Sequence, residues 1–312
     1  GGPAATIYFC IMDIIYFGSD AFGIPSLEEL KKKHQILCVI TAPDRPSGRG
    51  MKLAATPVKI WALENNIPVY QPEDISDRNF IETLKGLSPE IIVLISYGKI
   101  LPEAIIDIPS YGAINLHPSL LPKYRGAAPV EWALINGEKE TGITVITIKD
   151  KVDTGEIIKQ QKVPVDETDD IFSLRKRLSE IAPSILIESI DNIKKGVKPY
   201  PQKGIPTYAR RLKKEDGLIR WNKKAIEIYN LIRGAKEWPG SYTYLDGKYI
   251  KIYGAYPIYG QKKGEPGEVI DINGVCIYVA CGEGIIKITE LQMEGRKRMD
   301  TSEFLKGHPV NV

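Results

Sequence analysis

The chain has 312 residues, of which 43% are hydrophobic and 26% are charged, which is typical of a globular protein large enough for two domains. Its formal net charge is +3, but residues 201–312 hold 19 Lys and Arg against 13 Asp and Glu, so the first 200 residues are slightly acidic. A basic C-terminal part is compatible with contact to a polyanion, although charge alone favours a lysine-rich solvated surface.

The four cysteines exclude a zinc ribbon, since none forms a CxxC pair or a Cys–His cluster with metal-ligand spacing. We therefore expect free thiols in a reducing compartment, the cytosol. No apolar run reaches the roughly 20 residues of a membrane span. Residues 1–11 precede Met12 and lack a signal peptide's basic start, and we expect them to be a non-native upstream extension.

The first part of the chain alternates short apolar runs with amphipathic segments. The predicted strands cover residues 13–17, 36–41, 91–96 and 113–117, and the predicted helices cover residues 22–33, 56–66 and 127–136. This alternation predicts an α/β fold with a doubly wound, mostly parallel sheet of Rossmann-like type. The turn after the first strand is neither a GxGxxG nor a P-loop, so a nucleotide site is poorly supported there.

The pattern changes after Gly142. Two further strands, 142–148 and 156–165, precede a long amphipathic helix at 170–196. Residues 195–208 are rich in Pro, Gly and Lys, and we predict a linker between a catalytic domain at 12–194 and a second domain at 209–312. That second domain begins with a helix at 224–234 and continues as short strands separated by glycine turns, which predicts a small OB-like β-barrel.

The most informative residues follow the strand at 113–117. Asn115 and His117 are two residues apart, so their side chains point to the same face of that strand, at the sheet edge where α/β proteins place ligands. Asp153 lies on a turn between two later strands and can return to this site. Spacing alone leaves a catalytic trio and a structural Asn–His pair equally open.

The chemistry available to this trio is acyl transfer without a protein nucleophile. An amide donates hydrogen bonds to a developing oxyanion, and an imidazole stabilises the same oxygen or moves a proton near neutral pH. A carboxylate orients the imidazole or accepts a proton through water. Neither a GxSxG serine nor a nearby cysteine is present, so the substrate has to supply the nucleophile, such as a neutral amine.

Several motifs together resemble the 10-formyltetrahydrofolate-dependent formyltransferases, over nearly the whole chain from Met12. They are Asn115-Leu-His117, Ser119-Leu-Leu-Pro122, Arg125-Gly-Ala-Ala-Pro129 and Asp153-Thr-Gly155. Pro118 departs from the pattern, since relatives often have glycine there. The resemblance implies an oxyanion role for Asn115 and His117, a proton relay through Asp153, and no metal.

The resemblance also implies where the folate co-substrate and the acceptor bind. The expected folate contacts are Ser96, Tyr97, Gly98, Ile100, Leu101, Ser119, Leu120, Leu121 and Pro122. The loop from Ala42 to Lys52 resembles one that family members acting on initiator methionyl-tRNA insert after their second strand, and the second domain resembles theirs. The implied tRNA contacts are Arg45, Arg49, Lys52, Arg210 and Arg211. Composition alone favours a solvated surface loop at 44–52.

The sequence thus predicts a cytosolic, monomeric enzyme that formylates the α-amino group of methionyl initiator tRNA. The nearest alternative is a formyltransferase for an amino-sugar nucleotide, which needs the same trio but no arginine loop. A non-catalytic RNA-binding or folate-binding module is the alternative from another class, and the intact trio argues against it. Water as the acceptor would make a hydrolase, which the second domain disfavours.

Overall fold

The computed structural model describes residues 11–47, 52–260 and 264–308. The chain forms two compact units that interleave along the sequence. The first contains residues up to Ala127 together with Gly142–Val163 and Arg175–Tyr208, and the second contains Ala128–Thr141, Pro164–Leu174 and Ala209–Val312. The domain boundaries inferred from the sequence, 12–194 and 209–312, remain a prediction.

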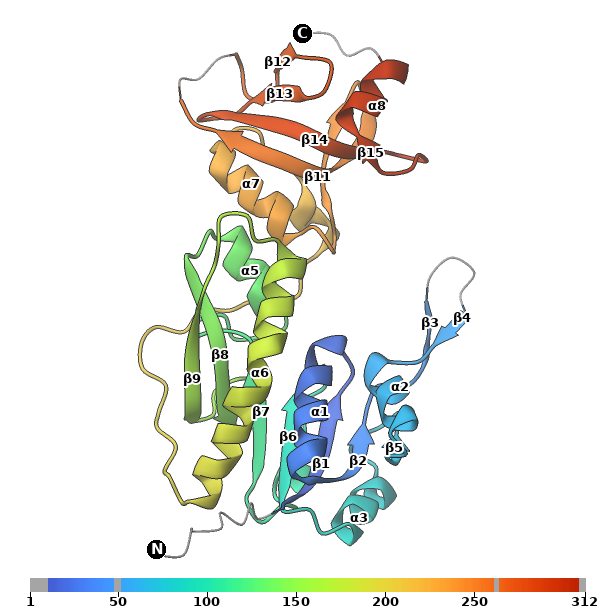
Figure 1. Cartoon of the computed structure of the whole chain (residues 1–312), viewed down its shortest axis with the longest axis vertical. Coiled ribbons are helices and arrows are strands. Elements are labelled where there is room, and N and C mark those ends of the chain that lie inside the picture. The colour runs from blue at the N-terminus through green and yellow to red at the C-terminus, as the bar shows by residue number, and fades with distance from the viewer. Residues whose placement is uncertain (1–10, 48–51, 261–263, 309–312) are drawn as a thin grey trace, which may run out of the picture. The chain divides into compact units, whose positions relative to one another are not determined.

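A seven-stranded sheet forms the centre of the first unit (Figure 1). Its spatial order is β5 (Val69–Tyr70), β2 (Gln35–Ile40), β1 (Asp13–Gly18), β6 (Ile91–Ile95), β7 (Ala113–His117), β8 (Glu140–Thr147) and β9 (Ile157–Pro164). The strands from β5 to β7 are parallel, and β8 is antiparallel to β7. This confirms the predicted doubly wound, mostly parallel fold.

The strand order reverses between β1 and β6, and α/β folds typically bind ligands outside the carboxyl ends of the strands at such a point. A hydrogen bond links the residues that follow these two strands: the amide of Ser19, after β1, donates to the carbonyl of Ser96, after β6, at 3.2 Å. Glycine is required at two positions near this turn. A Cβ on Gly18 would lie 2.6 Å from the carbonyl oxygen of Ile95, and one on Gly23 would lie 2.0 Å from the hydroxyl of Tyr16.

Helices flank the sheet of the first unit. They are η1 (Ala21–Gly23), α1 (Ile24–Lys33), α2 (Pro57–Glu64), α3 (Arg78–Gly86), α4 (Glu103–Ile106) and most of α6 (Ile171–Lys194). Figure 1 draws α1 and α6 on the same side, and Ser179 on α6 donates to the carbonyl of Phe22 at 2.7 Å. Among the helices in the described ranges, none combines the length and apolar run that a bilayer span requires.

Two features of this unit differ from expectation. The segment read as a plain loop contains a short antiparallel hairpin, β3 (Arg45–Ser47) with β4 (Lys52–Ala54). His34, expected at the surface, is buried, and its Nδ1 accepts a hydrogen bond from the amide of Met12 at 3.3 Å. In the second unit, His308 reads from its place in the C-terminal tail as a surface residue, but it is half-buried and its ring stacks on Phe304. A contact distant in the sequence, which local composition does not encode, involves the His34 ring, whereas His308 packs on its own helix.

The second unit contains an antiparallel sheet, as predicted. The path of five strands is β10 (Ser241–Leu245), β11 (Lys248–Ile258), β14 (Ile285–Met293), β13 (Ile277–Ala280) and β12 (Val269–Ile272), and β15 (Met299–Asp300) pairs with β14. Both turn residues between β10 and β11, Asp246 and Gly247, have positive φ. This is the conformation of the two-residue hairpin that an Asp-Gly pair predicts.

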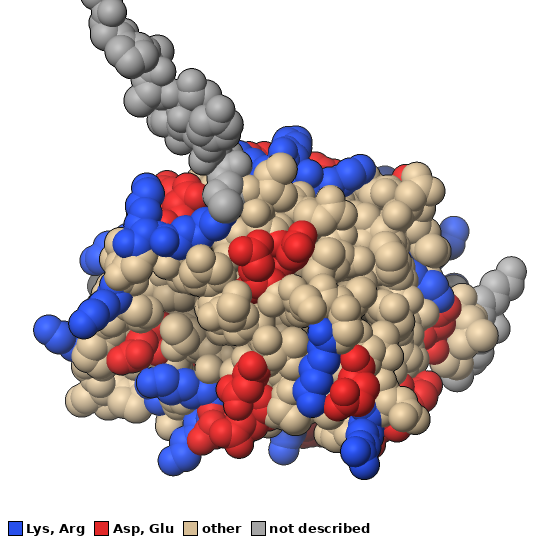
Figure 2. All heavy atoms as spheres, turned by 90° about the horizontal axis from the view of Figure 1, so that it is seen from below, with Lys and Arg blue, Asp and Glu red and all other residues tan. Residues whose placement is uncertain are grey.

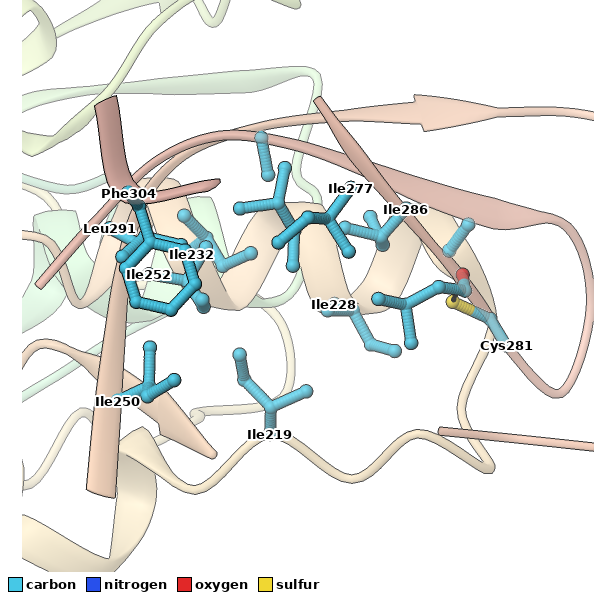
Figure 3. Packing of buried hydrophobic residues seen from close by; sticks show 14 residues of the cluster. Ile219, Ile228, Ile232, Ile250, Ile252, Ile277, Cys281, Ile286, Leu291 and Phe304 are labelled. Atoms are coloured by element: carbon cyan, nitrogen blue, oxygen red, sulfur yellow. Dashed lines mark hydrogen bonds between the residues drawn. The ribbon is translucent and has the colours of Figure 1, made fainter. Parts of the chain in front are cut away.

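Helices α5 (Pro129–Ile135), η2 (Lys214–Gly217), α7 (Ala225–Gly234) and α8 (Thr301–Gly307) complete the second unit. A Cβ on Gly234 would lie 2.7 Å from the Ile135 side chain, so glycine permits the close approach of α7 to α5. The apolar faces of α7 and the sheet share one core with Phe304 of α8 (Figure 3). The described cysteines, Cys38, Cys276 and Cys281, are free and buried, as expected.

Phe304 is 1% exposed and anchors α8 in this core, so its truncation should leave a cavity. We expect Phe304→Ala to lower the free energy of unfolding of the second unit by about 3–5 kcal/mol. The exposed Lys306 on the same helix provides the control, and Lys306→Ala should change it by less than about 0.5 kcal/mol. Urea unfolding followed by circular dichroism measures both, and equal midpoints for the two variants would contradict this packing.

Candidate active site beside strand β7

Three polar side chains meet beside β7. Asn115 Nδ2 donates to Asp153 Oδ1 at 3.1 Å, and His117 Nδ1 lies 3.5 Å from Asp153 Oδ2. The side chains of His117 and Asp153 are only 5% and 8% exposed, so the carboxylate and the ring interact largely out of water. The structure thus brings together the three residues that the sequence singled out.

The Asp153 carboxylate receives a further hydrogen bond that the sequence did not indicate. The main-chain amide of Gly126 donates to Asp153 Oδ2 at 2.8 Å. Asp153 itself has φ +54°, a left-handed conformation that non-glycine residues seldom adopt. In the same turn the Thr154 hydroxyl donates to the carbonyl of Lys151 at 2.8 Å. The turn therefore aims a buried carboxylate at both the Asn115 amide and the His117 ring.

The protonation of His117 follows from its partners. Nε2 lies 2.9 Å from the carbonyl oxygen of Tyr124, and a carbonyl oxygen can only accept a hydrogen bond. Nε2 consequently carries a proton, and in the neutral ring the lone pair is on Nδ1, which faces Asp153. Nδ1 is thus the ring nitrogen that can exchange a proton or bind a substrate oxygen. The ring cannot rotate without losing the Tyr124 contact.

The loop after β7 is held by side chains from β8 and β9. Thr144 Oγ1 donates to the carbonyl of Ser119 at 2.6 Å and accepts from the amide of Leu121 at 3.2 Å. Gln160 Nε2 donates to the carbonyl of Leu121 at 3.0 Å. The sequence did not indicate Thr144 and Gln160. Only the fold shows that β8 and β9 lie next to the loop that follows β7.

Most of the predicted folate contacts in the loop after β7 are buried. The Ser119 hydroxyl donates to the carbonyl of Lys123 at 2.7 Å, and Ser119 is fully buried. Leu121 and Pro122 are also buried, whereas Leu120 is half-buried. Ser119 therefore shapes the loop with its hydroxyl, and its expected contact with folate stays a prediction.

The second predicted folate segment follows β6 and divides into two sides. Tyr97 and Leu101 are buried in the core, and burial raises the pKa of the Tyr97 hydroxyl to about 12. Ser96 and Gly98 are exposed, and both have positive φ. Ile100 is 66% exposed. The residues of this segment accessible to a flat ligand are thus Ser96, Gly98 and Ile100.

The arginine loop has a well-anchored base. Asp44 accepts from Lys59 Nζ at 2.6 Å and from Gln71 Nε2 at 2.8 Å, and these contacts lower the pKa of the Asp44 carboxyl. Arg45 is exposed on β3, next to this anchor. Lys52 begins β4 opposite Ser47, and Arg49 lies outside the described residues. Arg45 is thus an exposed residue that directly follows the anchored Asp44.

The two predicted tRNA contacts of the second unit differ in their surroundings. Both guanidinium Nη atoms of Arg210 donate to the Asp216 carboxylate at 2.7 Å, and its guanidinium lies 5.2 Å from the Trp132 ring centre. Arg211 is exposed, and its carbonyl accepts a bond from Arg210. Arg210 therefore already has a structural partner, whereas the Arg211 side chain extends into solvent.

Comparison with known proteins assigns the fold and the site to a family. The formyl transferase model matches residues 12–190, and the model for the C-terminal domain of formyl transferases matches residues 211–309. The chain therefore belongs to the formyl transferase family. Within that family, its full-length relatives include the methionyl-tRNA formyltransferases of Pelotomaculum thermopropionicum, 44% identical, and Thermodesulfovibrio yellowstonii, 45% identical. Each alignment covers 96% of this chain and 96% of the relative.

Solved structures share the fold at much lower identity. The methionyl-tRNA formyltransferase from Clostridium thermocellum has a TM-score of 0.55 at 19% identity, covering 89% of this chain and 99% of that one. HypX from Aquifex aeolicus in complex with tetrahydrofolic acid has a TM-score of 0.66 at 18% identity. That match covers 95% of this chain but only 48% of HypX. These likenesses support the fold and not a substrate.

The turn that carries Asp153 requires glycine at position 155. A Cβ on Gly155 would lie 1.6 Å from the carbonyl oxygen of Thr147, so the turn must move to admit it. We expect Gly155→Ala to destabilise the protein by about 1–3 kcal/mol. The matched control is Gly86→Ala at the end of α3, where no atom lies within 4 Å of the new Cβ. Thermal unfolding compares them, and equal midpoints would show that the turn is less constrained than this.

Proposed function

We propose that this chain transfers the formyl group of 10-formyltetrahydrofolate to the α-amino group of the methionine carried by initiator tRNA. The observation that carries the proposal is the buried Asn115–His117–Asp153 cluster, within a chain 44% identical to a methionyl-tRNA formyltransferase along nearly its full length. The alternative acceptor, an amino-sugar nucleotide, has support only from solved structures of low identity, such as a sugar 3N-formyl transferase at 21%.

Each member of the cluster has a defined task in this reaction. Asn115 uses one Nδ2 hydrogen for Asp153, and its second hydrogen stabilises the oxyanion that forms when an amine attacks the formyl carbon. His117, protonated on Nδ1, donates to the same oxygen while Nε2 stays on the Tyr124 carbonyl. The Asp153 carboxylate stabilises the imidazolium and accepts, directly or through water, the proton that the attacking amine loses.

The overall reaction balances without any protein nucleophile. A bond forms between the amine nitrogen and the formyl carbon, and the bond between that carbon and N10 of the folate breaks. The proton lost by the amine ends on N10. The chain contributes fixed donors and one proton relay, which suits a site whose polar groups are buried and already hydrogen-bonded.

The folate fits the residues near the cluster. The exposed residues Ser96 and Gly98 would offer hydrogen-bonding groups, and the exposed Ile100 would offer an apolar surface. A pterin needs both, because its ring is flat and its edge is polar. Leu120, the half-buried residue of the Ser119–Pro122 loop, would form a second wall, and Thr144 maintains the position of this loop.

Removal of either oxyanion donor tests the catalytic assignment. We expect Asn115→Ala or His117→Ala to lower kcat by about 10²–10⁴-fold, because the donors act on charge that develops in the transition state. The assay measures labelled formate incorporated into methionyl-tRNA, with an amino-sugar nucleotide as a second acceptor, and thermal unfolding verifies the fold. Near-normal turnover in either variant, or transfer by the wild type only to the amino sugar, would refute the proposal.

For the acceptor, we infer that Arg45, Arg49, Lys52 and Arg211 contact the phosphates and unpaired bases of the tRNA. On the face drawn in Figure 2, by contrast, basic and acidic side chains are interspersed, so that face offers no patch of one sign to a polyanion. Arg210 contributes through its pairing with Asp216, which orders the start of the second unit. Among the cations whose side chains the structure describes, Arg210 would then have a structural role, and Arg45 and Arg211 would bind the tRNA.

A pair of adjacent variants separates these two roles. Arg211→Ala should raise the KM for tRNA by about 3–30-fold, as expected for the loss of one phosphate or base contact, and leave the unfolding midpoint unchanged. Arg210→Ala should lower the midpoint, because Asp216 loses its bidentate partner. Steady-state kinetics and thermal unfolding provide both values. An unchanged KM in Arg211→Ala would exclude that residue from the tRNA interface.

A further inference from the structure

The segment read from composition as a linker is fastened to the first unit at two points. Tyr200 and Ile157 exchange main-chain hydrogen bonds of 2.9 and 2.7 Å. Further along, the amide of Thr207 donates to the carbonyl of Pro122 at 3.2 Å, and the amide of Arg125 donates to the carbonyl of Thr207 at 2.9 Å. Residues 200–207 therefore run from β9 to the loop after β7 as a fixed strap.

Gln202 lies between these two anchors and uses its whole amide. Its Nε2 donates to the carbonyl oxygens of Asp153 and Gly155, both at 2.8 Å. Its Oε1 accepts from Nη2 and Nε of Arg125 at 2.7 and 3.2 Å. A side chain that donates two hydrogen bonds and accepts from a guanidinium at the same time has to be an amide, so glutamine matches this position chemically.

These contacts hold Asp153 from the side opposite its carboxylate. Asn115 and Gly126 fix the carboxylate, and Gln202 fixes the carbonyl of the same residue. The left-handed φ of +54° costs free energy, so the turn needs contacts at both ends to keep it. Without Gln202, the carbonyls of half-buried Asp153 and buried Gly155 lose their donor and the turn is free to relax, which moves the carboxylate.

We propose that Gln202 is a positioning residue for the formyl transfer: it fixes the Asp153 turn through the carbonyls of Asp153 and Gly155, and thereby sets the distance from the carboxylate to Asn115 and His117. This inference rests on the proposed function of the cluster. Gln202 acts through Asp153 and has no contact of its own with the reacting atoms. Its effect therefore belongs to the chemical step, and substrate affinity should be almost unaffected.

Two substitutions separate the two halves of the Gln202 amide. Gln202→Leu removes both the donors and the acceptor at similar volume. Gln202→Glu keeps an acceptor for Arg125 but turns carboxylate oxygens toward the two carbonyls, so it removes the donors alone. The matched control is Gln35→Leu, at an exposed glutamine where β2 begins, the end of the parallel strand remote from the site.

The experiment measures kcat, the KM for formylfolate, the KM for methionyl-tRNA and the unfolding midpoint of each full-length variant. We expect both Gln202 variants to lose about 10–100-fold in kcat, the cost of a displacement of up to ~1 Å at a catalytic group, with each KM within about 3-fold. Gln35→Leu should match the wild type. Gln202→Glu, which retains the Arg125 contact, should still fold, with a midpoint below that of the wild type because two carbonyls lose their donor.

Three results would overturn the inference while the wild type is active. They are a kcat within 2-fold of wild type in both Gln202 variants, a normal kcat in Gln202→Glu alone, or a loss confined to KM. The second result would assign the effect to Arg125, and the third would assign the strap to substrate binding. An inactive wild type is a different outcome, which refutes the proposed function itself.

Discussion

The buried carboxylate of Asp153 is the group on which the rest of the site depends. At 8% exposure it has lost most of its water, and a buried charge is tolerable only when protein groups replace that water. Asn115 and the amide of Gly126 donate to it, and His117 lies beside it. These partners come from β7 and from the loop after it. The hydrogen bonds that stabilise the Asp153 carboxylate therefore also hold the β7 loop and the Asp153 turn together.

The fold explains why the partners converge. β7 is the last parallel strand, and antiparallel β8 pairs Thr147 with Ile114 and Thr144 with His117. The β8–β9 turn therefore starts beside the Ile114 end of β7 and has to fold back over the strand before Asp153 reaches His117. Gly155 permits this close approach, and Gln202 holds the returned turn in place. The chemistry thus depends on a turn that the sheet brings near and that a later segment fixes.

Sequence reasoning located the side chains of this site but not the main-chain groups that complete it. Asn115 and His117 were predictable because a strand places every second side chain on one face. The Tyr124 carbonyl and the Gly126 amide were not, since every residue carries such groups and only the fold selects two of them. Gln202 was missed because a Pro- and Gly-rich composition predicts a linker, and its partner Asp153 is 49 residues away.

The most direct test of this account is the protonation of His117 measured by ¹⁵N NMR with ring-labelled histidine. Only three histidines are present, so His34→Gln and His308→Gln variants assign the signals. The account predicts that neutral His117 carries its proton on Nε2, held by the Tyr124 carbonyl, and that Asp153→Asn changes the signal of Nδ1. A neutral ring protonated on Nδ1, or an Nδ1 signal that ignores Asp153→Asn, would contradict it.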